Sequence, residues 1–226
     1  MEETIVISLG GSLIIPDELD INFLKEFRTL ILSQVAKGKK FVIITGGGKI
    51  NRKYNEAAKE ITNPSHEDLD WIGIAALKLN AELLRVIFGE YAYKEVISNL
   101  SNKFPFEKSI IIGSAYKPGS SSDLDAVLAA KTVGAKKIIN LSNIDYVYDS
   151  DPRTNPDAKK IENISWIDYR TLIPADWTPR LNSPLDPVAS KMAEEAGLEV
   201  MIMNGKPIDN LVQCLNGEKF QGTVIS

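Results

Sequence analysis

The sequence predicts an α/β fold, a three-layer αβα sandwich whose central sheet is mostly parallel. Two observations predict it. Short apolar runs rich in Ile and Val recur along the chain, and segments with the apolar period of a helix separate them. Apolar strands that alternate with helices are typical of parallel sheets covered on both faces. The 226 residues suit one such domain, so we expect residues 1–226 to form a single domain.

The first half of the chain contains two predicted strands that each run into a glycine-rich turn. Residues 4–9 form the first strand and precede Gly10-Gly11-Ser12. Residues 41–45 form the second strand and precede Gly46-Gly47-Gly48. Between them, apolar side chains recur at a helical period over residues 20–35. The order of strand, glycine turn and helix is therefore expected twice.

Residues 70–88 are predicted to form a long helix that is apolar over most of its surface. After Asp70 its only charged residues are Lys78, Glu82 and Arg85, which form one narrow stripe. A helix of this kind is buried on most of its circumference. We expect it either at the centre of the protomer or partly against another subunit.

The second half of the chain continues the alternation of strands and helices. Asp186-Pro187 is typical of a helix start, because an acidic N-cap is followed by proline at the first helical position. The predicted strands are residues 109–112, 137–141 and 199–203, the predicted helices are residues 120–133, 187–196 and 207–215, and residues 174–187 form a long loop.

Composition excludes several classes of function. A net charge of −4 does not suit a nucleic-acid-binding protein, because such proteins usually carry a basic face. The single cysteine, Cys214, excludes an internal disulfide, and the single histidine, His66, excludes a histidine-rich metal site. We place His66 in an ordinary turn. No apolar stretch reaches the length of a membrane span and no signal peptide is apparent, so we expect a cytoplasmic protein without a membrane partner.

Three loops that follow predicted strands are candidates for binding a phosphate or nucleotide. In the two glycine turns, backbone N–H groups can approach a phosphate closely, and the helix behind adds a favourable dipole. Neither turn matches a standard nucleotide motif, so each taken alone reads as a plain turn. The third loop, residues 113–123, is rich in serine. Because all three follow parallel strands, they would share the sheet edge where ligands bind.

Taken together, these segments resemble the archaeal type of uridylate (UMP) kinase, a branch of the amino-acid-kinase superfamily. The resemblance rests on VISLGGSLIIPDELDINFLKEF from Val6, ITGGGKINRKY from Ile44, DWIGI from Asp70, PGSSSD from Pro118, SNIDYVYDSDP from Ser142, PLDP from Pro184 and GTVI from Gly222. It covers essentially the whole chain in the family's order.

The resemblance implies the amino-acid-kinase fold and an enzyme that moves the γ-phosphate of ATP onto UMP to make UDP in pyrimidine nucleotide biosynthesis. It implies ATP and Mg²⁺ as cofactors and a homo-oligomer, a hexamer, as the working form. The N-terminal part would supply mainly the UMP site and the oligomer contacts, and the C-terminal part mainly the ATP site. UMP is already an anion at neutral pH, so the transfer needs no general base.

The resemblance also assigns roles to individual residues. For ATP it implies Gly10, Gly11, Ser12, Gly48, Arg52, Ser142, Tyr148 and Asp151. For UMP it implies Gly47, Asp70 on the ribose hydroxyls, and the loop formed by Ser114, Ala115, Tyr116, Lys117, Pro118, Gly119, Ser120 and Ser121. The implied catalytic residues are Arg52, Asp123 and Asp186. Arg52, together with Lys49, would stabilise the transferring charge, and the two acids would position the cations; no direct protein ligand to a metal is implied.

Departures from the family pattern leave alternatives open. Ser8 stands where the bacterial branch has lysine, although the archaeal branch also lacks that lysine, and Tyr146 stands where the family usually has glycine. Trp177 and Arg180 have no counterpart in the family pattern. The chain could phosphorylate another acceptor, a small acid or an isoprenoid phosphate, or it could bind nucleotides without catalysis.

Overall fold

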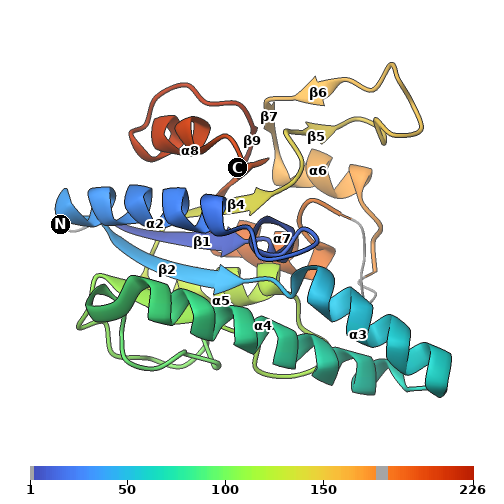
Figure 1. Cartoon of the computed structure of the whole chain (residues 1–226). Coiled ribbons are helices and arrows are strands. Elements are labelled where there is room, and N and C mark those ends of the chain that lie inside the picture. Colours follow the sequence, from blue (N-terminus) through green and yellow to red (C-terminus); the bar gives the residue numbers. More distant parts are fainter. Residues whose placement is uncertain (1–2, 177–182) are drawn as a thin grey trace.

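The computed structural model describes residues 3–176 and 183–226 and contains one large sheet (Figure 1). Its strands are β1 (Thr4–Leu9), β2 (Lys40–Thr45), β3 (Ile110–Gly113), β4 (Lys137–Ser142), β7 (Asn163–Ile164), β8 (Glu199–Asn204) and β9 (Thr223–Ile225). They lie in the order β3-β2-β1-β4-β8-β9-β7, and the pairs are parallel except β8 with β9. A separate antiparallel pair joins β5 (Val147–Tyr148) to β6 (Lys160–Ile161).

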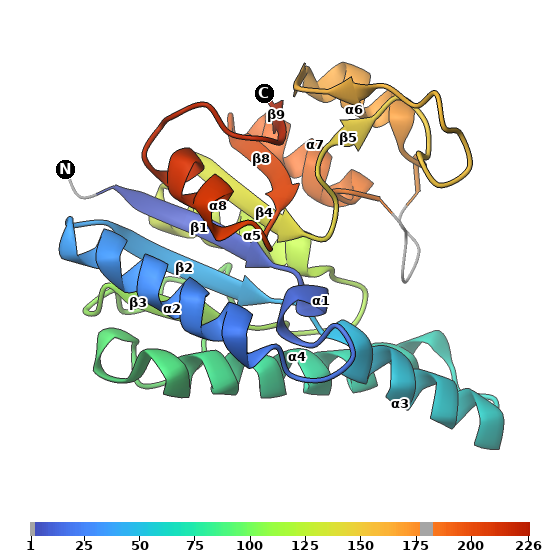
Figure 2. The same ribbon diagram turned by 45° about the horizontal axis from the view of Figure 1, so that its top comes forward.

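Alternate side chains of the strands contribute to two apolar cores, one on each face of the sheet. In β1, Ile5, Ile7 and Leu9 belong to the first core and Val6 to the second. The first core packs under α1 (Gly11–Ile14), α2 (Ile21–Ala36), α4 (His66–Phe88) and α8 (Ile208–Leu215), and the second under α5 (Ser122–Val133), α6 (Trp166–Leu172) and α7 (Pro187–Glu195) (Figure 2). The predicted three-layer sandwich with a mostly parallel sheet is confirmed.

The carboxyl ends of the central strands carry the loops that were predicted to bind a ligand. The first glycine turn follows β1, and the second follows β2 and starts α3 (Gly48–Ile61). The serine-rich loop leads from β3 to α5. Helix α3 and the N-terminal half of α4 project beyond the strand ends (Figures 1 and 2). The three loops therefore meet at one edge of the sheet, beside these two helices.

The long helix α4 begins four residues earlier than predicted. Ser65 is its N-cap, because the Ser65 Oγ accepts a hydrogen bond from the Asp68 N–H at 3.1 Å. The Asp68 carboxylate accepts one in return from the Ser65 N–H, also at 3.1 Å, which completes a capping box. His66 is therefore the first residue of a helix, and its placement in an ordinary turn was wrong.

Helix α4 is also more exposed than predicted. Trp71, Leu79 and Val86 are 50%, 58% and 64% exposed in the single protomer. Its opposite side, which includes Leu84 and Phe88, is fully buried against the first core. Helix α4 is therefore not at the centre of the protomer, and the alternative that part of it lies against another subunit stays a prediction.

Several short elements were not predicted, because a few residues show no measurable period. These are α1, α6, the pair β5–β6, β7, β9 and a 3₁₀ turn at Gly89–Tyr91. Helix α5 begins at Ser122 and not at residue 120, since the Ser121 Oγ caps it by accepting from the Leu124 N–H. The predicted loop over residues 174–187 falls partly outside the described residues, and so do Trp177 and Arg180.

No helix within the described residues is both long enough and apolar enough to cross a membrane.

Candidate active site

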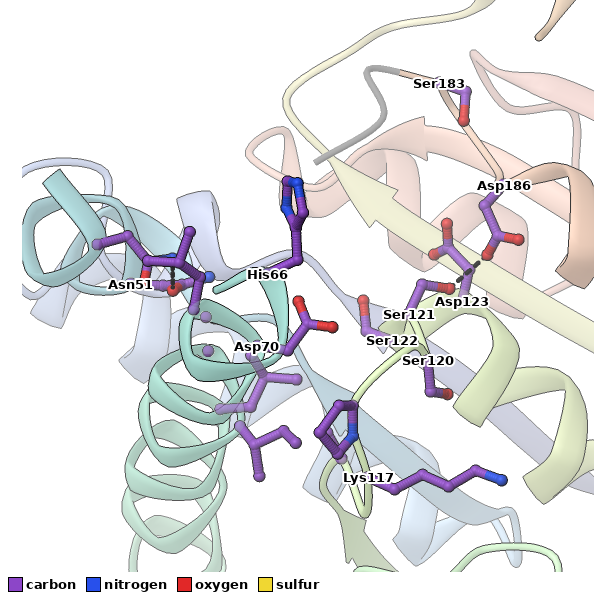
Figure 3. A pocket seen from close by; sticks show the side chains of 18 of the residues that line it. Asn51, His66, Asp70, Lys117, Ser120, Ser121, Ser122, Asp123, Ser183 and Asp186 are labelled. Atoms are coloured by element: carbon purple, nitrogen blue, oxygen red, sulfur yellow. Dashed lines mark hydrogen bonds between the residues drawn. The ribbon is translucent and has the colours of Figure 1, made fainter. Parts of the chain in front are cut away.

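A cavity of about 360 Å³ opens between the α3–α4 pair and the N-terminal ends of α5 and α7 (Figure 3). Its lining comes from four segments: the polar side of α3 with Gly47, the first turns of α4, residues 115–123, and the chain just before α7. These segments are far apart in the sequence and meet only because the parallel strands end at the same edge.

Helix α4 presents Asp70 to the cavity. The Asp70 carboxylate faces the serines of the loop before α5 across the cavity (Figure 3). Its Oδ2 accepts a hydrogen bond from the Gly119 N–H at 3.0 Å, so α4 and this loop are joined directly. His66 lies one turn earlier on the same helix and also lines the cavity. His66 was not predicted at this site, because the predicted helix started too late.

Helix α3 presents a row of polar side chains that the sequence reasoning also missed. Asn51, Asn55 and Lys59 are spaced by four residues and all line the cavity. The Asn55 Nδ2 donates to the Asn51 Oδ1 at 2.9 Å, and Asn55 is buried. A Cβ atom on Gly73 of α4 would lie 3.4 Å from the Asn51 amide. The spacing of four, which places residues on one face of a helix, was the available signal.

Asp123 and Asp186 lie side by side where α5 and α7 begin (Figure 3). Asp186 caps α7, since its Oδ1 accepts from the N–H groups of Val188 and Ala189 at 2.8 and 2.9 Å. Its Oδ2 accepts a hydrogen bond from the Ser121 Oγ. The expectation that Asp186 begins a helix is confirmed, and capping alone accounts for that local role.

The pKa of Asp123 is raised to about 7. The main cause is burial, which removes water from the carboxylate, and the second is the negative charge of Asp186. Hydrogen bonds from Ser8 and Asn140 act in the opposite direction and lower the pKa of Asp123. Two acids that repel each other in this way favour a cation between them, because a positive charge offsets both effects.

A further acid, Asp125, lies deeper in α5. It is only 3% exposed, and its Oδ1 accepts a hydrogen bond from the Ser120 Oγ at 3.4 Å. Its Oδ2 is buried and has no hydrogen-bond partner among the residues that the structure describes. Burial raises its pKa to about 7. Asp125 was not predicted as a site residue, because an acid one turn into a helix usually faces water.

The two glycine turns contact each other backbone to backbone. A Cβ atom on Gly11 would lie 2.6 Å from the Gly46 carbonyl carbon, and one on Gly46 would lie 2.5 Å from the Gly11 nitrogen. Gly48 has a φ of +65°, which favours glycine, and a Cβ there would lie 2.5 Å from the Gly11 oxygen. Only glycine fits at these positions, whatever the turns bind.

Most of the residues predicted to bind UMP line the cavity. These are Gly47, Asp70, Ala115, Lys117, Pro118, Ser120 and Ser121. Gly119 contributes its N–H to Asp70. Ser114 is fully buried and Tyr116 is 53% exposed, and neither lines the cavity. The structure thus brings the predicted acceptor loop, Asp70, Asp123 and Asp186 together.

Arg52 and Lys49 lie on α3 but do not line this cavity. Arg52 is exposed. Lys49 forms an ion pair with Asp17. Their predicted role beside the transferring phosphate stays a prediction.

The residues predicted to hold the adenosine half of ATP lie beyond β4. Ser142 ends β4, and Tyr148 belongs to β5. Asp151 begins a turn and forms three hydrogen bonds of 2.7 to 3.2 Å with the Arg153 guanidinium. The Arg153 side chain lowers the pKa of Asp151 to about 2. The ATP role of Ser142, Tyr148 and Asp151 stays a prediction.

Comparisons with known proteins give similarity over the whole chain. A model of the amino acid kinase family matches residues 3–204. A uridylate kinase from Thermococcus onnurineus is 34% identical over 98% of both chains, and one from Sulfurisphaera tokodaii is 31% identical over 98% of both chains. The crystal structure of a uridylate kinase from Archaeoglobus fulgidus superposes with a TM-score of 0.82 at 30% identity and covers 100% of both chains.

Proposed function

We propose that this chain, which belongs to the amino acid kinase family, is an ATP-dependent kinase that phosphorylates UMP. The observation that carries the proposal is its similarity to uridylate kinases from end to end, about a third identical over 98% of the chain. In the reaction, an oxygen of the UMP phosphate attacks the γ-phosphorus of ATP. The bond from that phosphorus to the bridging oxygen of ADP breaks, and UDP and ADP leave.

The cavity beside α4 would hold UMP. Asp70 would accept hydrogen bonds from the ribose hydroxyls, and the loop that includes Ser120 and Ser121 would surround the base. The bond from Gly119 to Asp70 supports this arrangement, because it fixes the carboxylate and the loop relative to each other. A nucleotide that contacts both would be oriented before the transfer, which lowers the entropy cost of reaction.

The glycine turns would hold the phosphates of ATP between the two nucleotides. Gly10, Gly11, Ser12 and Gly48 would offer backbone or hydroxyl groups, with Arg52 stabilising the charge on the transferring oxygens. Ser142, Tyr148 and Asp151 would contact the adenosine half. The direct packing of the two turns supports this proposal, because it places both sets of backbone groups at one point.

The acid pair fits a magnesium ion. Asp123 and Asp186 are adjacent carboxylates, and the pKa of Asp123 is raised first by burial and then by the charge of Asp186. Such a pair offers the oxygen ligands that Mg²⁺ prefers, directly or through water. Within residues 3–176 and 183–226, no group of three or more His, Cys, Asp or Glu side chains could hold a metal by itself. Asp123 and Asp186 would hold the ion, and ATP phosphates would complete its ligands. When bound, Mg²⁺ neutralises charge on the phosphates.

The working form would be a homo-oligomer, with the hexamer as the expected size. A second, mostly apolar cleft of about 470 Å³ lies between residues 15–19, α3 and α4. Leu19, Tyr54 and Leu79 in its lining are 46%, 64% and 58% exposed. Exposed apolar side chains gathered beside a cleft favour burial against a second copy of the chain. The cytoplasmic location also stays a prediction.

An assay of acceptor choice tests the proposal. ADP release is measured with ATP and, in parallel, UMP, CMP, AMP, GMP, small phosphorylated acids and an isoprenoid phosphate. We expect UMP to be phosphorylated at least about tenfold more efficiently than the other acceptors, as for a site that hydrogen-bonds its own base. Equal turnover of all monophosphates would contradict the UMP assignment. Nucleotide binding without ADP release would favour the non-catalytic alternative.

A further inference from the structure

Two polar side chains lie together in the apolar interior of the sheet, beneath the acid pair. Ser8 of β1 and Asn140 of β4 are register partners and are only 3% and 5% exposed. Across the sheet they are flanked by Ile44 of β2 and Ile202 of β8. A buried hydroxyl or amide in an apolar row is unfavourable unless it is hydrogen-bonded. The hydrogen-bond partners of Ser8 and Asn140 therefore indicate why polar side chains occupy these two positions.

Both side chains donate a hydrogen bond to the same carboxylate oxygen. The Ser8 Oγ lies 3.4 Å and the Asn140 Nδ2 lies 3.1 Å from the Asp123 Oδ1. The Asn140 Nδ2 also donates to the Pro184 carbonyl at 3.1 Å. Pro184 lies two residues before Asp186. One buried amide therefore contacts Asp123 and the segment that carries Asp186.

Asp123 and Asp186 are also linked to each other through the loop before α5. The Ser121 Oγ, two residues before Asp123, donates to the Asp186 carboxylate. The orientation of the pair thus depends on two strands and two helix starts. An apolar side chain at position 8 or 140 would continue the sheet core equally well, so packing alone does not call for these polar groups.

We propose that Ser8 and Asn140 are positioning residues for phosphoryl transfer. They hold Asp123, and through Pro184 also Asp186, in the one arrangement in which both carboxylates face the cavity. Neither residue touches a substrate itself. Preorganised charge matters because a displacement of about 1 Å can cost on the order of a hundredfold in rate. The expected effect on kcat rests on the proposed function, whereas the expected effect on the orientation of the two carboxylates does not.

The kinetic test compares Asn140→Leu with Asn210→Leu. Asn210 is a buried amide of α8 whose two hydrogen bonds, both 2.7 Å, go to the backbone of Gln221. Both variants should lower Tm, but only Asn140→Leu should lower kcat, by at least about tenfold. Its KM for UMP should change by less than about threefold, because Asp70 and its loop are untouched. An unchanged kcat for Asn140→Leu, or an equal fall for Asn210→Leu, would overturn the proposal.

A milder pair of variants covers the case in which Asn140→Leu does not fold. Ser8→Ala removes one donor to Asp123 at little cost in volume, and Ser8→Thr keeps the hydroxyl on a strand-favouring side chain. We expect Ser8→Ala to lower kcat at least about threefold, the size of one lost hydrogen bond, and Ser8→Thr to restore it. Equal kcat values for Ser8→Ala and the wild type would count against Ser8 as a positioning residue.

A double variant shows whether Asn140 acts through Asp123. Asp123→Asn by itself should lower kcat, and adding Asn140→Leu should then cost less than about twofold more, since residues of one network are not additive. Multiplicative losses would mean that Asn140 acts elsewhere and would contradict the proposal.

A crystal structure of Asn140→Leu provides a readout that needs no turnover. The Asp123 carboxylate should rotate away from its position over β1 and β4, and the Pro184 carbonyl should move. Both groups in their original places would overturn the proposal. If the wild-type protein does not phosphorylate UMP, the proposed function fails, and this structure still decides the positioning role by itself.

Discussion

Among single side chains, Asp125 should have the clearest effect on how the free energy of unfolding depends on pH. Burial raises its pKa from 3.8 to about 7, so between these values the folded protein keeps a proton that the unfolded chain releases. The associated stability is fully present below about pH 4 and is lost as the pH rises through 7. Above that pH, folding must bury a charged carboxylate whose Oδ2 finds no hydrogen-bond partner in the described part of the chain.

We therefore predict that Asp125→Asn is more stable than the wild type at pH 8, by up to roughly 4 kcal/mol for a shift of this size. The difference should shrink towards pH 4. Thermal unfolding from pH 4 to pH 8 measures it, with the exposed Glu26→Gln on α2 as the control. A difference in Tm that does not depend on pH would show that Asp125 is not a buried titrating group.

Arg52 tests whether an exposed charge on α3 takes part in the reaction. Its guanidinium could neutralise phosphate oxygens in a fixed, bidentate geometry that lysine does not reproduce. We predict that Arg52→Ala and Arg52→Lys both lower kcat by at least about tenfold, as for loss of one transition-state contact. Tm should hardly change, because Arg52 is exposed.

Steady-state kinetics and thermal unfolding check this prediction side by side. Lys25→Ala, which removes an exposed positive charge from α2, is the matched control and should keep the wild-type kcat. If Arg52→Ala matches that control, Arg52 is an ordinary solvated helix residue.

At the scale of elements, the two glycine turns should depend on each other. A Cβ on Gly11 would lie 2.6 Å from the Gly46 carbonyl carbon, so alanine there must push the turns apart. Gly134, at the end of α5, has a φ of +71° but open space around it. We predict that Gly134→Ala costs about 1 kcal/mol from backbone strain, and that Gly11→Ala costs at least about 3 kcal/mol. Denaturant unfolding compares the two, and similar losses would mean that the turns can separate freely.

At the scale of the whole molecule, the exposed side of α4 predicts self-association. Leu79→Glu and Val86→Glu should reduce the particle mass measured by light scattering at micromolar concentration, because a buried glutamate at an interface is unfavourable. Both residues are more than half exposed in the protomer, at 58% and 64%, so the variants should stay folded by circular dichroism. Ile74 and Leu84 on the same helix are unsuitable, because they are buried within the protomer.

Ile167→Glu on α6 is the matched control, since Ile167 is 67% exposed and lies on the other face of the sheet. It should leave the particle mass unchanged. A wild-type protein that is monomeric at these concentrations, with full activity, would contradict the oligomer proposal.

The main elements of the fold could be predicted because local signals decide them. The strands at residues 4–9, 41–45 and 137–141 are continuous apolar runs, and they agree with β1, β2 and β4 to within one residue. The cap at Asp186 followed by Pro187 was visible directly. The start of α4 was predicted too late, because the prediction followed the apolar period from residue 70. The capping box of Ser65 and Asp68 starts the helix earlier.

By itself, the sequence determined the layer architecture, the three loops at one sheet edge, and the presence there of Asp70, Asp123 and Asp186. The layers and the shared edge follow from periodicity and from the rule that parallel strands end together, whereas the three acids were placed there by the resemblance to the uridylate kinase family. Only the tertiary structure decided which side chains share the cavity and which are buried. His66 and the polar row of α3 reach the cavity, while Ser114 and Asp125 are buried, and Ser8 and Asn140 meet Asp123 across two strands. Such contacts depend on register and helix rotation between distant segments, which no local pattern encodes.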